Sequence, residues 1–125
     1  MNINEISTDA LAYLGDSVIE LKVREHLVSL GYSSSRHLNS ESLKYVKASA
    51  QSQAMRNIIP LLSDAETLVY KRGRNKQTAN IPKSATVSEY RSATGMEVLF
   101  GYLYLCGFNS RIDTLFRAGY GIEKE

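Results

Sequence analysis

Hydrophobic residues recur at intervals of three and four along most of the chain, which is the spacing of one face of an α-helix. Leu11, Leu14, Val18 and Leu21 illustrate this spacing near the N-terminus. We find no stretch in which apolar and polar positions alternate as in a half-buried strand, and no internal repeat. The pattern predicts an all-α protein.

Helix start and stop signals divide the first half of the chain. The first predicted helix runs from about Glu5 to Leu30, where Gly31 is a natural stop. A second helical region covers about Ser40 to Leu62 and is interrupted near Pro60. A third helix begins at Ser63, because Ser63-x-x-Glu66 has the form of a capping box.

The second half of the chain contains a loop and two further helices. The segment from Lys76 to Val87 is polar and lacks periodicity, so we expect a loop there. Thr86-x-x-Glu89 is another capping box and opens a helix that runs to about Cys106. Ser110-x-x-Asp113 predicts a short last helix that ends before Gly119. These elements account for residues 1–125 as one domain.

Composition limits the class of protein without revealing its chemistry. A chain of 125 residues suits a single compact domain, and the one cysteine, Cys106, excludes an intrachain disulfide. No secretion signal is expected, since polar residues interrupt the N-terminus, and the apolar run from Val98 to Phe108 is too short to span a bilayer. We expect a soluble cytoplasmic protein with no membrane partner.

Two carboxylates lie within the most apolar helices. Asp16 follows Leu14-Gly15, and Glu97 stands between Met96 and Val98. No basic residue lies three or four positions from either acid, so compensation must come from another helix or from a bound cation. Two carboxylates from separate helices can hold Mg²⁺, which prefers oxygen ligands. Exposure to solvent, or pairing with a distant arginine, is an equally good explanation at this point.

Other titratable residues have simpler explanations. Asp9 and Glu20 share a helical face with Asp16, and we interpret them as part of a solvated stripe. His26, His37 and Cys106 have no sequence pattern that links them to chemistry, so we expect structural or surface roles.

Basic and amide side chains concentrate between Lys71 and Arg91, although the net charge is only +2. Such a mixture suits contact with a polyanionic backbone. Cations in the last turn of a helix also interact favourably with its dipole, which explains Lys71 and Arg72 well and the loop cations less well. We predict that the RNA-binding residues are Arg72, Arg74, Asn75, Lys76, Lys83 and Arg91, with further hydrogen bonds from Gln77, Thr78 and Asn80.

Several motifs together resemble a known family. Residues 10–18, ALAYLGDSV, look like the signature helix of the ribonuclease III endonuclease domain, and residues 94–103, TGMEVLFGYL, resemble its second catalytic helix. The segments 72–75 (RGRN), 82–83 (PK) and 46–54 (VKASAQSQA) are similar to the Mini-ribonuclease III branch. The resemblance covers almost the whole chain in the expected order.

The resemblance implies a fold, an activity and a partner. It implies a homodimeric ribonuclease III-like domain that hydrolyses double-stranded RNA with Mg²⁺, or Mn²⁺ as a substitute, held by Asp16 and Glu97. It also implies maturation of the 23S ribosomal RNA precursor, with a ribosomal protein as a conceivable cofactor. The dimer face is expected on the first helix and on Val98–Leu105. Gly15 and Gly101 serve either close helix approach near the metal or ordinary packing.

Two features depart from full-length ribonuclease III. The family has further acidic residues where this chain has Ala12 and Thr94, so only Asp16 and Glu97 carry over. The Mini-ribonuclease III branch shares this reduced set. We also expect no double-stranded-RNA-binding domain, which normally reads duplex shape over roughly 16 base pairs.

Two rival functions remain open at this point. One is a non-catalytic RNA-binding or ribosome-binding protein that keeps the fold, for which Ala12 and Thr94 are mild support. The other is an all-helical metal phosphohydrolase of small nucleotides, although His26 and His37 lack the helical spacing of metal ligands.

Overall fold

A computed structural model describes residues 2–77 and 81–123 of the chain. Within these residues every regular element is helical, and no strand is present, which confirms the all-α prediction. The elements are the 3-10 turns η1 (Ile3–Glu5) and η2 (Ile59–Leu61) and the helices α1 (Thr8–Ser29), α2 (Ser35–Val46), α3 (Ala48–Ile58), α4 (Asp64–Arg74), α5 (Val87–Leu105) and α6 (Asn109–Tyr120).

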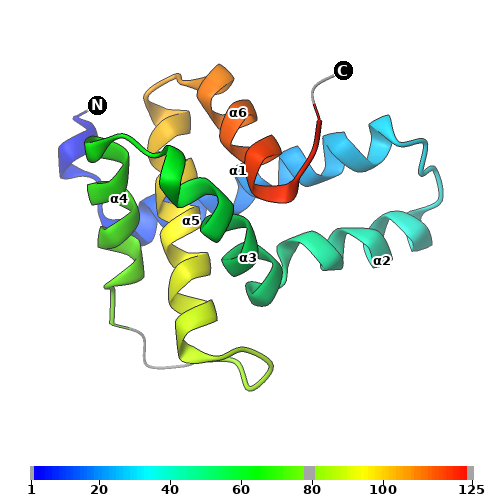
Figure 1. Cartoon of the computed structure of the whole chain (residues 1–125), viewed down its shortest axis with the longest axis horizontal. Helices are drawn as coiled ribbons and strands as arrows, with labels where there is room; N and C mark the ends of the chain where they lie inside the picture. The colour runs from blue at the N-terminus through cyan, green and yellow to red at the C-terminus, as the bar shows by residue number, and fades with distance from the viewer. Residues whose placement is uncertain (1, 78–80, 124–125) are drawn as a thin grey trace.

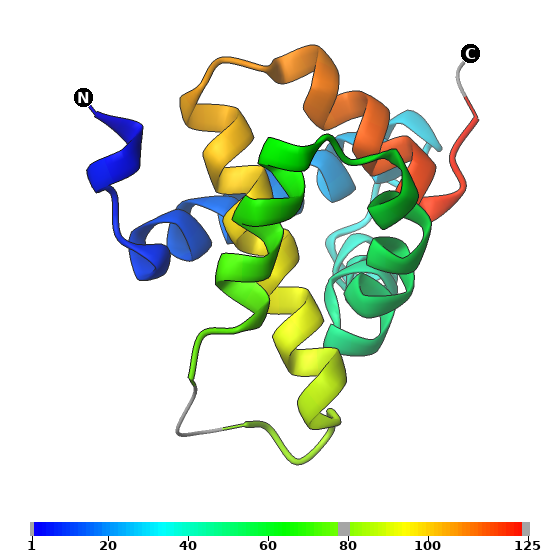
Figure 2. The same ribbon diagram turned by 60° about the vertical axis from the view of Figure 1, so that its left-hand side comes forward.

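Helix α5 is the centre of the molecule. It contacts α1, α3, α4 and α6, and Figure 2 shows it running between α4 and α3. The α5 residues that face these neighbours are apolar or small on every side of the helix, which is the pattern of a helix buried all round. The buried residues of α5 are Ala93, Gly95, Met96, Val98, Leu99, Phe100, Gly101 and Leu103.

The two capping boxes that the sequence predicts are both present. The Ser63 hydroxyl accepts a hydrogen bond from the backbone N–H of Glu66, and the Glu66 carboxylate accepts one from the Ser63 N–H. Thr86 and Glu89 form the same reciprocal pair at the start of α5. Each box satisfies two N–H groups that have no partner within the helix. The loop between Arg74 and Val87 therefore ends where the sequence predicts.

The boundaries of α1 and the division of the second region differ from the prediction. Helix α1 begins at Thr8 and not at Glu5, because the Ser7 side chain caps it. Leu21, whose spacing groups it with the apolar face of this helix, is 54% exposed. The second region contains two helices, because the backbone of Lys47 is extended (φ −63°, ψ 151°). It turns the chain between α2 and α3, as Figure 1 shows.

The last helix also differs from its prediction. Helix α6 begins at Asn109 without a side-chain cap, so Ser110 does not start it. The helix continues through Gly119, whose missing side chain allows it to lie against Ile58. It ends at Gly121, which adopts the left-handed conformation (φ 66°) that favours glycine.

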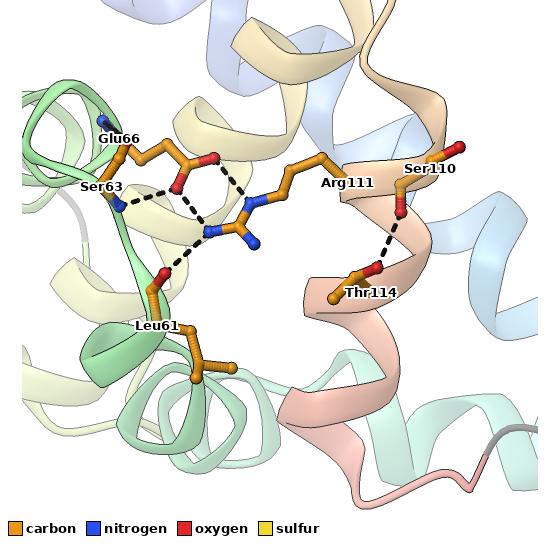
Figure 3. A network of polar contacts seen from close by, with 6 residues as sticks. All are labelled: Leu61, Ser63, Glu66, Ser110, Arg111 and Thr114. Carbon is orange, nitrogen blue, oxygen red and sulfur yellow. Dashed lines mark hydrogen bonds and ion pairs between the residues drawn. The ribbon is translucent and has the colours of Figure 1, made fainter.

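An ion pair between the half-buried Arg111 and the buried Glu66 fastens α6 to α4, as Figure 3 shows. Arg111 donates from Nε to Glu66 Oε2 (2.9 Å) and from its terminal nitrogen to Glu66 Oε1 (2.8 Å) and to the Leu61 carbonyl (2.7 Å). The hydrogen bonds from Arg111 hold the pKa of Glu66 below its usual value. Arg111 thus joins two segments that lie 45 residues apart in the sequence.

Among residues 2–77 and 81–123, no helix combines the length and apolar character that crossing a lipid bilayer requires.

Candidate active site

Helices α1 and α5 touch backbone to backbone where they cross. A Cβ atom added to Gly15 would lie 1.6 Å from the carbonyl oxygen of Glu97, and one added to Gly101 would lie 2.1 Å from that of Leu11. No side chain fits in either place. Both glycines are therefore required for the close approach of the two helices, and the crossing brings Asp16 next to Glu97.

Asp16 and Glu97 line one cavity of about 300 Å³. Asp16 is exposed and Glu97 is half-buried. Burial, followed by the negative charge of Asp16 and a hydrogen bond shared with it, raises the pKa of Glu97 to about 8. An acid in this environment carries a proton near neutral pH or requires a cation beside it. The remaining lining residues are Glu20, Val46, Lys47, Ala48, Gln51, Pro82, Ser84, Ala85, Tyr90, Ala93 and Thr94.

Neither carboxylate is neutralised by an arginine or lysine in the part of the chain that the structure describes. Pairing with a distant arginine, the explanation left open by the sequence, is therefore wrong. By contrast, Glu20 pairs with Arg24 (3.3 Å) and Asp9 pairs with Lys76. Asp9 and Glu20 thus behave as ordinary surface acids, whereas Asp16 and Glu97 lack such partners.

Gln51, which also lines the cavity, carries a buried oxygen that lacks a partner among the described residues. The side chain of Gln51 is 4% exposed, and its Nε2 donates to the Val46 carbonyl (3.1 Å). That bond fixes the orientation of the amide, and it leaves Oε1 as a buried oxygen without a hydrogen-bond partner among the described residues. An unsatisfied buried acceptor costs about 1–3 kcal/mol, so a donor or a cation beside it is expected.

The donor set fits a hard divalent cation such as Mg²⁺. Two carboxylates line one cavity, and carboxylate oxygens are the ligands that Mg²⁺ prefers. The described residues contain no cluster of three or more histidine, cysteine, aspartate or glutamate side chains that would hold a metal. An ion here would therefore keep several of its waters.

The predicted RNA-binding residues do not all line one cavity. Arg72 donates to the Thr8 hydroxyl (2.7 Å) and to the Ile6 carbonyl (2.6 Å), and so it anchors the N-terminal segment. Lys76 is paired with Asp9. Lys83 lies between Pro82 and Ser84, which line the acidic cavity. Thr78 and Asn80, which the sequence predicts to add hydrogen bonds alongside Gln77, lie outside the described residues.

Arg74, Asn75 and Arg91 line a second, larger cavity of about 550 Å³. Arg56 joins them there from α3. Sequence reasoning missed Arg56, because nothing in its local pattern distinguishes it from a surface arginine. It also missed Lys47 and Gln51 as individual residues, although both fall within the quoted segment 46–54.

The histidines have structural surroundings, as the sequence predicts. The ring of His26 meets that of Tyr45 edge to face at 5.7 Å, and the ring of His37 meets that of Tyr32 at 6.4 Å. Neither histidine lines the acidic cavity. Cys106 caps the C-terminal end of α5 through its backbone N–H.

Comparison with known proteins gives concordant results. The Ribonuclease III domain family matches residues 9–107. Mini-ribonuclease 3 of Symbiobacterium thermophilum is 43% identical over 108 residues, which cover 86% of this chain and 83% of that protein. Mini-ribonuclease 3 of Enterococcus faecalis is 41% identical over 108 residues, which cover 85% and 82%. The X-ray crystal structure of a protein from Fusobacterium nucleatum superposes with a TM-score of 0.82 at 33% identity, covering 92% of each chain.

The helical fold and the matched domain define a ribonuclease III-type endoribonuclease. Enzymes of this class generally depend on divalent metal ions. Because the relatives match over most of both lengths, the chain belongs to the Mini-ribonuclease III family.

Proposed function

We propose that this protein is a Mg²⁺-dependent endoribonuclease that hydrolyses phosphodiester bonds of double-stranded RNA at the cavity of Asp16 and Glu97. The observation that carries the proposal is the meeting of two carboxylates, 81 positions apart in the numbering, without a basic partner. Two charged carboxylates this close repel each other, and the partial burial of Glu97 adds to the cost of ionising both. A cation removes that cost.

Three residues of the cavity have distinct roles in this proposal. Asp16 and Glu97 would hold the ion, and the Gln51 oxygen would accept a hydrogen bond from its water shell. Bound there, Mg²⁺ would supply Lewis-acid chemistry that activates water and neutralises charge on the phosphate. The two carboxylates also orient water for in-line attack. Mn²⁺, which also binds oxygen ligands, is expected to substitute.

The positions that lack the family's further acids fit a site with fewer protein ligands. The hydroxyl of Thr94 donates to the Tyr90 carbonyl (3.0 Å) and is therefore satisfied within its own helix. Ala12 offers no ligand atom. Water is the simplest replacement for both, because Mg²⁺ dehydrates reluctantly and usually keeps several waters.

Positive groups on the opposite wall would guide the RNA backbone. Lys47 is exposed and lines the cavity at the N-terminal end of α3, which has no side-chain cap. Uncapped N–H groups at a helix start favour anions. Together with Lys83 they would bring the scissile phosphate to the two acids, while Arg74 and Arg91 contact the duplex farther away. The 23S ribosomal RNA precursor is the proposed substrate, and a ribosomal protein is a candidate cofactor.

A homodimer, in which each subunit cuts one strand, is the assembly that we propose. Tyr13 on α1 is 85% exposed and Leu68 on α4 is 70% exposed, so apolar surface is available near the N-terminal half of α1. The sequence predicts that the segment Val98–Leu105 shares this face. Most of its large hydrophobic side chains are instead at least partly buried in the core, and among them only Tyr104 is exposed. The dimer face is therefore proposed on α1 and α4.

The decisive test is cleavage of a duplex RNA with Mg²⁺ by the wild type, Asp16→Asn and Glu20→Gln. Glu20 is a matched control, because it lies on the same helix and lines the same cavity, but its carboxylate pairs with Arg24. We expect Asp16→Asn to lose cleavage and Glu20→Gln to keep most of it. Unchanged cleavage by Asp16→Asn would refute the site. Binding without cleavage by the wild type would favour the non-catalytic rival, and hydrolysis of nucleotides alone would favour the phosphohydrolase.

A further inference from the structure

The cavity of about 550 Å³ lies between α3, α4 and α5, and it shares no lining residue with the acidic cavity. Arg56 reaches it from α3, Arg74 from α4 and Arg91 from α5. The other lining residues are Ser52, Ile59, Tyr70, Asn75, Val87, Ser88 and Ser92. Three guanidinium groups from three helices thus surround one concave space.

No carboxylate compensates these charges. None of the lining residues is acidic, and none of the three arginines takes part in an ion pair within the described residues. Arg56 donates to the neutral Gln53 amide (3.2 Å), and Arg74 donates to the neutral Asn75 amide (3.2 Å). Like charges around a common cavity repel one another, and an anion between them would turn that repulsion into attraction.

The remaining walls supply hydrogen-bond donors. Ser88 lies in the first turn of α5, where the helix dipole is positive, and Ser92 lies one turn later. The Ser92 hydroxyl is 3.3 Å from that of Tyr70, whose ring packs 5.8 Å beneath the Arg74 guanidinium. That contact holds Arg74 at the wall of the cavity. Hydroxyls and guanidinium groups together match the oxygens of a tetrahedral anion.

We propose that this cavity is a phosphate-binding pocket in which Arg56, Arg74 and Arg91 surround the anion. A phosphate group can come from two sources, the backbone of an RNA duplex or a small phosphate ester. Binding of the RNA backbone rests on the proposed function, whereas binding of a small phosphate ester does not. Arg56 is the residue that joins the basic segment to a third helix, because it lines the cavity from α3.

The first experiment titrates inorganic phosphate into the metal-free protein and follows the arginine Nε–Hε signals by NMR. We expect saturable shifts at the pocket arginines. Replacing one arginine should weaken binding about tenfold in Arg56→Gln and in Arg91→Gln, because each loses a charge-assisted hydrogen bond. Arg36→Gln is the matched control, since Arg36 is an exposed helical arginine that lines neither cavity. Absence of saturable shifts, or an equal effect of Arg36→Gln, would overturn the proposal.

The second experiment separates the two sources of phosphate. Duplex RNA and a nucleoside monophosphate are each added, without divalent metal, to the protein with phosphate bound. Displacement of phosphate by the duplex, with a salt slope shallower by about one in Arg91→Gln, would assign the pocket to the RNA backbone. Displacement by the nucleotide alone would assign it to small esters.

The outcomes also distinguish this proposal from the nuclease proposal. Duplex cleavage that depends on Asp16, combined with no phosphate binding, would refute the pocket and keep the nuclease. Phosphate binding that depends on Arg56 and Arg91, combined with cleavage that ignores Asp16→Asn, would do the reverse.

Discussion

Two glutamates of this protein, Glu66 in the first turn of α4 and Glu97 in the middle of α5, lie in opposite electrostatic environments. Glu66 on α4 is buried beside Arg111, which donates two hydrogen bonds to it. Glu97 on α5 is half-buried beside Asp16, and no cation of the described chain reaches either acid. The pKa of Glu66 is therefore lowered, whereas burial and the nearby negative charge raise the pKa of Glu97 to about 8.

The difference separates a structural carboxylate from a functional one. Glu66 is satisfied by the protein itself, and its partner Arg111 also binds the Leu61 carbonyl, so the pair joins α4, α6 and η2. The charged form of Glu97 has no compensating partner in the protein, so ionising it costs free energy. Glu97 lies where α1 and α5 are so close that only glycine fits at positions 15 and 101. Perturbed acids of this kind concentrate at functional sites, because catalysis requires charges that the fold leaves uncompensated.

Exchanging each glutamate for glutamine should produce the largest contrast. Glu97→Gln is expected to lower duplex cleavage at least about 100-fold, because a divalent metal supplies several kcal/mol of transition-state stabilisation. Its thermal stability should be retained or increased. Glu66→Gln should cleave normally at 20 °C but melt earlier. Cleavage rates and melting curves of both variants test this prediction, and equal losses of activity would break the distinction.

Removing the partner of Glu66 should have the second-largest effect. Arg111→Met is expected to lower the free energy of unfolding by about 2 kcal/mol, because it leaves a buried carboxylate without its charged partner and the two hydrogen bonds from Arg111. Arg117→Met, on the same helix, is the control, since Arg117 makes no ion pair in the described structure. Urea unfolding of both variants measures the difference. Equal destabilisation would mean that the Glu66–Arg111 pair has no special role.

The smallest predicted effect is a pH dependence of opposite sign at the two sites. Glu97 has a folded pKa above its usual 4.5, so its contribution to stability is present below pH 4.5 and is lost as pH rises toward about 8. Glu66 has a folded pKa below its usual value, so its contribution is present above pH 4.5 and is lost as the solution becomes more acidic.

Melting temperatures in EDTA between pH 5 and 8 measure this effect. The wild type should lose stability with rising pH over this range more steeply than Glu97→Gln, and Mg²⁺ should stabilise the wild type more at pH 8 than at pH 6. Identical slopes in the two proteins would show that Glu97 titrates as an ordinary exposed acid.

Local signals predicted the parts of the fold that depend on neighbouring residues. The Ser63 and Thr86 capping boxes set the starts of α4 and α5, because their hydrogen bonds span three residues. The break at Lys47 carried no such signal, since neither glycine nor proline marks it. The Glu66–Arg111 ion pair could not be predicted from local sequence either, because the two residues lie 45 positions apart and meet only after the helices pack.

The candidate site likewise contains features that local sequence signals predict and features that depend on how distant helices pack. The absence of basic neighbours around Asp16 and Glu97 identified both acids, and the resemblance of their helices to a known family placed them together. The positions of the arginines could not be predicted in the same way, because a run of charged residues does not indicate which side chains line a common cavity. Arg72 binds the N-terminal segment, while Arg74 and Arg91 meet Arg56 from a distant helix.

The central claim is that Asp16 and Glu97 share a divalent cation. Crystals soaked in Mn²⁺ allow this ion to be located by its anomalous scattering. We predict a peak within coordination distance of a carboxylate oxygen from each residue, or one water away, and loss of the peak in Asp16→Asn. A peak elsewhere, or none at saturating Mn²⁺ and pH 8, would contradict the account.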